Sequence, residues 1–315
     1  MKKNCLVLTA LVAIASLLAS AQCVTAQQSA SPTGPAVNLV VTVEARHGSN
    51  IPEITKDDVM VYEGRDRDRV TGWLPLQGDH AGMELFILID DSSSVSLGSQ
   101  LEDIRQFINA QPPTTKIGVA YMQNGIAQIV QNLTTDHALA AKALRLPLGN
   151  PGASASPYFS LEDLIKRWPA SEERHEVLMI TDGIDRYWGS GPDNVYVDQV
   201  IEKAQRAGMI VYSIYTPGVG HYSHSYWRTY WAQNYLAQLS DETGGESYYL
   251  MGPAPPVTFA PYLEDMSRKL NHQYLLTFIA KPQKKAGMQR VKVQTEVPNA
   301  ELISADKVYV PATPQ

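Results

Sequence analysis

Cysteine is almost absent from this 315-residue sequence, which contains only Cys5 and Cys23. Both lie in or beside residues 1–26, a segment with the character of a cleaved export signal. If cleavage follows Ala26, the mature chain has no cysteine, and its stability must come from packing rather than from disulfides. The apolar content of 44% is ample for a core, and the length allows one large domain or two small ones.

The sequence also lacks an excess of basic residues, with 26 Lys and Arg against 32 Asp and Glu and a formal charge of −6. Removal of residues 1–26 takes away two lysines and no acidic residue, so the charge becomes −8. No basic stripe remains, which argues against a nucleic-acid partner. The acidic balance suits the binding of a cation.

The common catalytic motifs are missing as well. There is no G-x-x-x-x-G-K-[ST] phosphate loop and no G-x-S-x-G nucleophile elbow, and the stretch 152–156 lacks the closing glycine of such an elbow. A haloacid dehalogenase phosphatase would carry D-x-D after its first strand, but Ser92 stands where the second acid would be. We therefore expect a protein that is not an enzyme.

Residues 1–26 contain the three parts of a secretory signal. Lys2 and Lys3 form the basic start, 6–18 is the apolar run, and Val24-Thr25-Ala26 is a small-residue cleavage site. The apolar run is short for a retained membrane anchor, so no transmembrane segment is expected in the mature chain. Residues 27–36 are expected to form a flexible leader.

A lipid anchor on Cys23 is the alternative fate of this segment. The usual lipobox has leucine three residues before the cysteine and a small residue just before it, whereas this chain has Ser20 and Gln22. A cut after Ala21 is the alternative to one after Ala26. The sequence predicts an exported protein, periplasmic or secreted, and argues against a lipoprotein.

Two apolar runs end abruptly in polar residues. The first run, 85–89, is followed at alternate positions by Asp90, Ser92 and Ser94, and the second, 177–180, is followed by Thr181, Asp182 and Gly183. Apolar residues on both faces are typical of central strands in a parallel sheet covered by helices. In such sheets the ligand site lies beyond the carboxyl ends of the strands. One charge and two hydroxyls form a hard-cation ligand set, suited to magnesium.

The period of the apolar residues divides the chain. From 83 to 271 strands alternate with helices, the pattern of a doubly wound, mostly parallel α/β sheet. The segments 37–80 and 272–315 instead read as strands, among them 289–295. We expect these two flanks to pair with each other as a small β module beside the α/β domain.

The motifs D-x-S-x-S at 90–94 and T-D-G at 181–183 resemble those of the von Willebrand factor type A family. The resemblance covers roughly 83–271 and implies a Rossmann-like fold with an antiparallel edge strand. It also implies a metal-ion-dependent adhesion site, in which the hydroxyls of Ser92 and Ser94 bind the cation directly. Asp90 and Asp182 would act partly through water, and a third loop would supply another hydroxyl.

The third loop departs from the family pattern, which has a threonine, often after a Gly-Gly pair. This chain offers Ser154 or Ser156 instead, and Ser156 is equally suited to cap the helix that follows. Asp185 either orients the site by hydrogen bonding or caps the next loop. Asp91 is expected to point away from the metal and to serve solubility and turn capping.

The resemblance implies recognition rather than turnover. A bound Mg²⁺ (or Mn²⁺ or Ca²⁺) with an open position would accept an Asp or Glu side chain from a protein partner. Tyr, Trp and Arg dominate protein-binding hot spots. The expected partner-binding rim therefore consists of Arg186, Tyr187, Trp188, His221, Tyr222, His224, Tyr226 and Trp227.

The two histidines of this rim have zinc-compatible spacing but no further ligand is evident, so zinc is set aside. The alternative is a structural or assembly protein of the cell envelope with a vestigial metal site.

Overall fold

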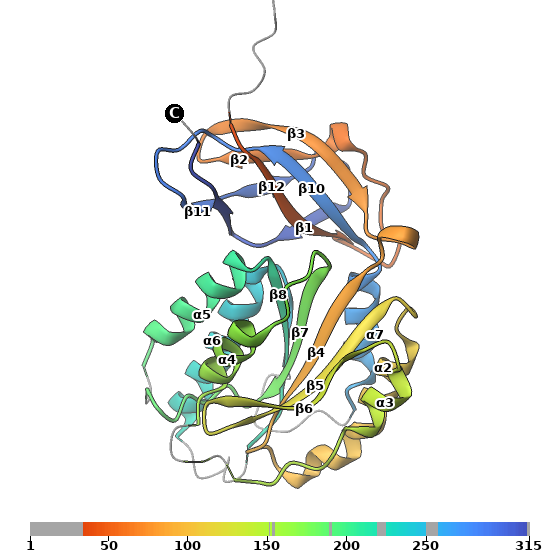
Figure 1. Ribbon diagram of the computed structural model, residues 1–315, viewed down its shortest axis with the longest axis vertical. Coiled ribbons are helices and arrows are strands. Elements are labelled where there is room, and N and C mark those ends of the chain that lie inside the picture. The colour runs from red at the N-terminus through yellow and green to blue at the C-terminus, as the bar shows by residue number, and fades with distance from the viewer. Residues whose placement is uncertain are drawn as a thin grey trace, which may run out of the picture. The chain divides into compact units, whose positions relative to one another are not determined.

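The computed structural model describes residues 34–150, 152, 155–188, 191–218, 225–249 and 258–313. The expected signal and most of the expected leader, together with Ser154, His221, Tyr222 and His224, lie outside these ranges. The described chain forms two six-stranded sheets and one two-stranded sheet (Figure 1).

The first sheet has the order β6-β5-β4-β7-β8-β9. Its strands are β4 (Met83–Asp90), β5 (Thr115–Gln123), β6 (Ile126–Thr134), β7 (Arg174–Thr181), β8 (Met209–Tyr215) and β9 (Ser247–Tyr248). All eight residues of β4 are buried, as expected for a central strand of a parallel sheet. β6 alone runs antiparallel, and it is joined to β5 by the turn at Asn124 and Gly125, which both have positive φ.

Helices cover both faces of this sheet (Figure 1). One face packs against α2 (Leu101–Ala110), α3 (His137–Lys142) and α7 (Ala260–Leu270), and the other against α4 (Pro157–Arg167), α5 (Val195–Arg206) and α6 (Tyr226–Thr243). The short 3₁₀ helices are η1 (Lys56–Asp58), η2 (Gly78–His80) and η3 (Val95–Gln100). The alternation of strands and helices predicted for 83–271 is confirmed, because each apolar helix face lies on the apolar face of the sheet.

The second six-stranded sheet has the order β12-β2-β3-β10-β1-β13. Its strands are β1 (Ala36–Ala45), β2 (Met60–Glu63), β3 (Asp66–Pro75), β10 (Gln273–Ile279), β12 (Lys292–Gln294) and β13 (Ala300–Ser304). The separate two-stranded sheet consists of β11 (Gly287–Arg290) and β14 (Lys307–Val310). Strands from before and after the α/β domain therefore alternate, with β10 lying between β1 and β3. These strands have a hydrophobic core of their own, in addition to the two on the faces of the α/β sheet, and it includes Val41, Phe278 and Val310.

The strand predicted at 289–295 is wrong in detail, because the chain changes partners at Val291. β11 pairs with β14, the N–H of Val291 donates to the carbonyl of Asp306, and β12 then pairs with β2. Strand β13 was not predicted. Only one of its residues, Ala300, is buried, so the sequence has no clear period there.

Candidate functional site

Asp90 lies at the end of β4, where its carboxylate joins two strands. Its Oδ1 accepts hydrogen bonds from the backbone N–H of Ser92 at 2.8 Å and from the Ser92 hydroxyl at 2.6 Å. Its Oδ2 accepts from the Thr181 hydroxyl at the end of β7, at 2.7 Å. Because β4 and β7 are parallel neighbours, the D-x-S-x-S and T-D-G motifs meet at the same edge of the sheet.

Asp182 follows β7 and is 1% exposed. Its Oδ1 accepts from the N–H of Ile184 at 2.9 Å, whereas its Oδ2 has no hydrogen-bond partner among the described residues. Burial, and next the negative charge of Asp90, raise the pKa of Asp182 to about 7. The N–H of Ile184 and the charges of Arg186 and Arg228 act in the opposite direction. Asp182 directly follows Thr181, whose hydroxyl donates to Asp90, so both carboxylates belong to the same edge of the sheet.

The segment after β8 lies against these carboxylates. Gly218 forms an isolated β-bridge with Ser93, and the N–H of Ser94 donates to the carbonyl of Pro217 at 3.2 Å. A Cβ on Gly218 would lie 2.3 Å from Asp182 Oδ2. Glycine is therefore required for this close approach, independently of its φ.

The two remaining serine candidates both cap helices. The Ser94 hydroxyl accepts from the N–H of Ser96 at 3.3 Å at the start of η3. The Ser156 hydroxyl accepts from the N–H of Phe159 at 3.4 Å at the start of α4, and Ser156 is buried. A capping hydroxyl keeps one lone pair for another ligand, since each hydroxyl oxygen has two.

A cavity of about 10 Å³ lies beside these groups, and its lining includes Asp90, Ser92, Ser156 and Arg186. This volume corresponds to roughly one water-sized sphere. The N–H of Arg186 donates to the carbonyl of Ala155 at 2.9 Å, which ties the third loop to the loop after β7. Three loops therefore converge on a space that suits a single small ion or water.

Asp185 organises the loop after Asp182. Its Oδ1 accepts from the N–H groups of Tyr187 and Trp188 at 2.9 and 3.1 Å. Its Oδ2 accepts from the side-chain amide of Asn194, the N-cap of α5, at 3.1 Å. Of the two roles considered for Asp185, these contacts are those of a loop cap.

Four aromatic rim residues are exposed in the described chain. The exposed fractions are 56% for Tyr187, 42% for Trp188, 74% for Tyr226 and 62% for Trp227. The Tyr226 and Trp227 rings contact each other with centroids 5.7 Å apart, and Tyr187 packs on Phe159. Arg186 differs from these four, because its side chain is only 17% exposed and its Nη2 lies 3.7 Å from Asp182 Oδ2.

Asp91 has a role that sequence reasoning missed. It is 1% exposed, so the predicted contribution to solubility is wrong. Its oxygens accept from both terminal nitrogens of Arg145 at 2.7 and 3.0 Å, and Oδ1 also accepts from the N–H of Leu148. The guanidinium lies over the Tyr121 ring at 3.8 Å. Asp91 therefore fixes the segment after α3 beside the site, and no local sequence signal links it to a residue so distant in the chain.

The donor atoms at this edge of the sheet fit a hard divalent cation. Within the described ranges no three His, Cys, Asp or Glu side chains form a metal-ligand group. The site instead combines two carboxylates with serine hydroxyls, and Mg²⁺ is commonly held by one or two carboxylates together with waters. Among the described residues, the buried Oδ2 of Asp182 has no hydrogen-bond partner, although the Arg186 guanidinium lies 3.7 Å from it.

The mostly parallel sheet, the antiparallel edge strand β6 and the meeting of the two motif loops agree with what the resemblance implies. The α/β domain thus has the architecture expected of a von Willebrand factor type A fold. Similar solved structures include BatB from Bacteroides thetaiotaomicron, at 13% identity and TM-score 0.44 over 60% of this chain and 97% of that one. Another is a von Willebrand factor type A protein from Catenulispora acidiphila, at 12% identity and TM-score 0.44 over 91% of this chain and 75% of that one.

A third similar structure is the manganese-loaded TRAP protein of Plasmodium vivax, at 10% identity and TM-score 0.39 over 71% of this chain and 93% of that one. No family model and no curated protein matches the sequence. Across the part of the chain that the structure describes, no helix is both long and apolar enough to cross a membrane.

Proposed function

We propose that this chain is an exported protein-binding module whose A-type domain holds a divalent cation, Mg²⁺ or alternatively Mn²⁺ or Ca²⁺, and binds a protein partner through it. The hydroxyls of Ser92, Ser94 and Ser156 would be direct ligands, with Asp90 and Asp182 partly acting through water. The observation that carries the proposal is the hydrogen bond from the Thr181 hydroxyl to Asp90, which joins the two motifs at one edge of the sheet, beside a buried Asp182 oxygen that has no hydrogen-bond partner among the described residues.

When bound, the cation supplies an open coordination position for an Asp or Glu side chain of the partner. The protein's own residues contribute orientation and desolvation. Asp90 orients the Ser92 hydroxyl, and Asp185 holds the loop that carries Tyr187 and Trp188. Exposed aromatic rings beside the cation would bury against the partner and exclude water from the charged contact.

A structural or assembly role without metal is the second candidate, and one contact favours it. The guanidinium of Arg186 lies 3.7 Å from Asp182 Oδ2 and also borders the small cavity. A cationic side chain in this place can neutralise Asp182 as a metal ion would. In that case the site would stabilise the loops and the partner would not need a cation.

The two candidates differ in their response to chelation. Partners captured by the purified chain from envelope extract in Mg²⁺ should fall at least tenfold in EDTA and in Asp90→Ala. Glu102→Ala, a change of an exposed carboxylate on α2, is the matched control and should capture normally. Capture that ignores both EDTA and Asp90→Ala would reject the cation-dependent function and favour the structural one.

A further inference from the structure

The first half of β1 is paired on one side only. β10 pairs with β1 over residues 36–42, but β13 on the other side pairs only with residues 41–45. No described strand pairs with residues 36–40 on the side away from β10. This segment is therefore a sheet edge, with backbone groups available for another strand.

The hydrogen bonds at the end of β1 show which of its residues direct their N–H and C=O groups to the open side. The N–H of Val43 donates to His272 beside β10, whereas the N–H of Arg46 donates to Asn299 beside β13. In an antiparallel ladder, successive residues bond to opposite sides. Odd-numbered residues of β1 thus bond toward β10, and the N–H and C=O groups of Ala36, Asn38 and Val40 face the open edge.

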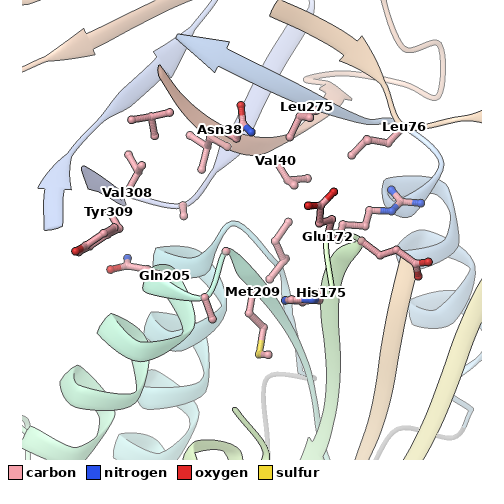
Figure 2. A pocket seen from close by; sticks show the side chains of 18 of the residues that line it. Asn38, Val40, Leu76, Glu172, His175, Gln205, Met209, Leu275, Val308 and Tyr309 are labelled. Carbon is pink, nitrogen blue, oxygen red and sulfur yellow. The ribbon is translucent and has the colours of Figure 1, made fainter. Parts of the chain in front are cut away.

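This edge borders a cavity of about 710 Å³ (Figure 2). All five residues from Ala36 to Val40 line it, although the side chains of Val37 and Leu39 belong to a core on the other face. The edge of the strand itself, rather than one face alone, therefore forms part of the wall. The volume lies in the usual range for ligand sites, which occur preferentially between packed structural units.

Strand β14 contributes a second unpaired edge to the same cavity. Lys307, Val308 and Tyr309 line it. The N–H of Val291 bonds to Asp306, so even-numbered residues of β14 bond toward β11 and the backbone groups of Lys307 and Tyr309 face away from β11. Both β1 and β14 therefore have backbone N–H and C=O groups on the side away from the strand with which they pair.

The side chains of the cavity are apolar in the middle and charged at the ends. Figure 2 shows Val40, Leu275 and Met209 in the central part. Glu172 lies beside Val40, on the side of the cavity away from Tyr309 (Figure 2). Three acidic residues, Asp79, Glu172 and Glu173, and three basic ones, Arg174, Arg206 and Lys307, are among the lining residues. Arg174 is buried and donates to the carbonyl of Leu270, so one of its hydrogen bonds is already made within the chain. The Arg206 guanidinium lies over the Tyr309 ring at 4.6 Å, so positive charge belongs to the Tyr309 end.

A buried acceptor in this wall is unsatisfied. Gln205 is 4% exposed, and its Nε2 donates to the carbonyl of Glu242, but its Oε1 has no hydrogen-bond partner among the described residues. Gln205 lines the cavity near Tyr309 (Figure 2). A buried amide oxygen without a donor is costly, so a ligand with N–H groups would be favoured here.

We propose that this cavity binds an extended peptide segment of a partner protein, which adds to the open edge of β1 as an antiparallel strand. Main-chain hydrogen bonds to Ala36, Asn38 and Val40 would align the peptide, and its apolar side chains at alternate positions would enter the middle of the cavity. Running antiparallel, the peptide places its first residues near Glu172, which favours a basic residue there. Its last residues lie near Arg206 and Lys307, which favours an acidic one.

This site is separate from the proposed cation site. Glu172 to His175 and Gly208 to Met209 lie at the amino ends of β7 and β8, whereas Asp90 and Asp182 lie at the carboxyl ends of β4 and β7. The inference goes beyond the proposed function and does not depend on it. Peptide binding should accordingly be the same in Mg²⁺ and in EDTA.

The probe is a labelled, end-blocked peptide of about seven residues with lysine first, glutamate last and alternating valine and threonine between them, measured by fluorescence anisotropy. Wild-type protein should bind it saturably. Asn38→Pro removes one open-edge N–H and leaves the backbone bonds of β1 to β10 in place, and should weaken binding about tenfold. Like the control below, it also loses the hydrogen bond that the Asn38 side chain accepts from the Thr277 hydroxyl on β10. The matched variant Asn38→Ala keeps that N–H and should bind within about twofold of wild type.

Three further measurements complete the test. The peptide methylated on alternate amide nitrogens should lose binding, which tests the backbone mode even if Asn38→Pro fails to fold. The peptide with lysine and glutamate exchanged should bind more weakly to wild type. Glu172→Lys should reverse that preference.

Four results would overturn the proposal. Three concern the peptide: no saturable binding up to about 1 mM, equal binding by Asn38→Pro and wild type, or loss of binding in EDTA. The fourth is a wild-type dimer that becomes monomeric in Asn38→Pro. The last of these would assign the edge to a second copy of the chain.

Discussion

Glu176→Gln is expected to raise the free energy of unfolding at pH 9 by several kcal/mol and to flatten its dependence on pH. Glu176 lies on β7 and is fully buried, and neither carboxylate oxygen has a hydrogen-bond partner among the described residues. Burial raises the pKa of Glu176 to about 8, from 4.5, although the positive charge of Arg174 and, after it, the nearby Gln273 side chain oppose the shift. The neutral acid is therefore the form that the folded protein prefers.

The sign of the pH effect follows from proton binding. Between pH 4.5 and about pH 8 the folded state holds a proton on Glu176 that the unfolded state has released. Stability therefore falls as pH rises through this window, by on the order of 3–5 kcal/mol when fully developed. Glutamine has nearly the same shape and carries no charge, so this loss should disappear.

Urea denaturation at pH 5, 7 and 9 measures the effect. The two proteins should differ little at pH 5 and most at pH 9. Burial also raises the pKa of Asp68 to about 6 and that of Asp182 to about 7, but both groups are present in both proteins and cancel in the difference. Glu102→Gln, at an exposed position, should follow wild type throughout. If the free energies of unfolding of Glu176→Gln and wild type differed by the same amount at every pH, this account of Glu176 would be wrong.

Gly218→Ala is expected to weaken binding of a divalent cation by more than tenfold while the protein still folds. The added Cβ would lie 2.3 Å from Asp182 Oδ2 and 3.5 Å from the carbonyl oxygen of Ser92. Because Asp182 Oδ1 is held by the N–H of Ile184, the side chain cannot turn aside without breaking that bond. We expect the carboxylate to shift out of place, at a cost to stability of about 1–3 kcal/mol from overpacking.

Titration with Mn²⁺, followed by the loss of the free-ion electron paramagnetic resonance signal, measures this change. Gly287→Ala is the matched control, since its Cβ would meet nothing within 4 Å and its φ is not positive. That variant should bind as wild type does. An unchanged Mn²⁺ affinity in Gly218→Ala would show that the position of Asp182 Oδ2 does not matter for the cation.

The meeting of Asp90 with the second motif could be predicted because it depends on strong local signals. Two buried apolar strands in a parallel sheet bring their carboxyl ends to one edge, so Asp90 and Thr181 had to lie near each other. The alternation of strands and helices over 83–271 could be predicted as well, because most of these segments carry a clear apolar period.

The missed features depend on contacts between distant segments. The Asp91–Arg145 pair forms only when the segment after α3 returns to the end of β4. The tight fit of Gly218 against Asp182 depends on the path of the chain after β8. The partner change at Val291 likewise depends on which strand lies opposite, and the alternation of apolar residues does not encode that.

Direct titration of the purified chain with Mn²⁺, with Mg²⁺ as competitor, is the measurement that bears most directly on the central claim. Wild type should bind about one Mn²⁺ per chain, displaced by Mg²⁺, and the double variant Asp90→Ala/Asp182→Asn should bind none at that site. Equal binding by both proteins, or no saturable binding by wild type, would contradict the assignment of a cation site to these residues.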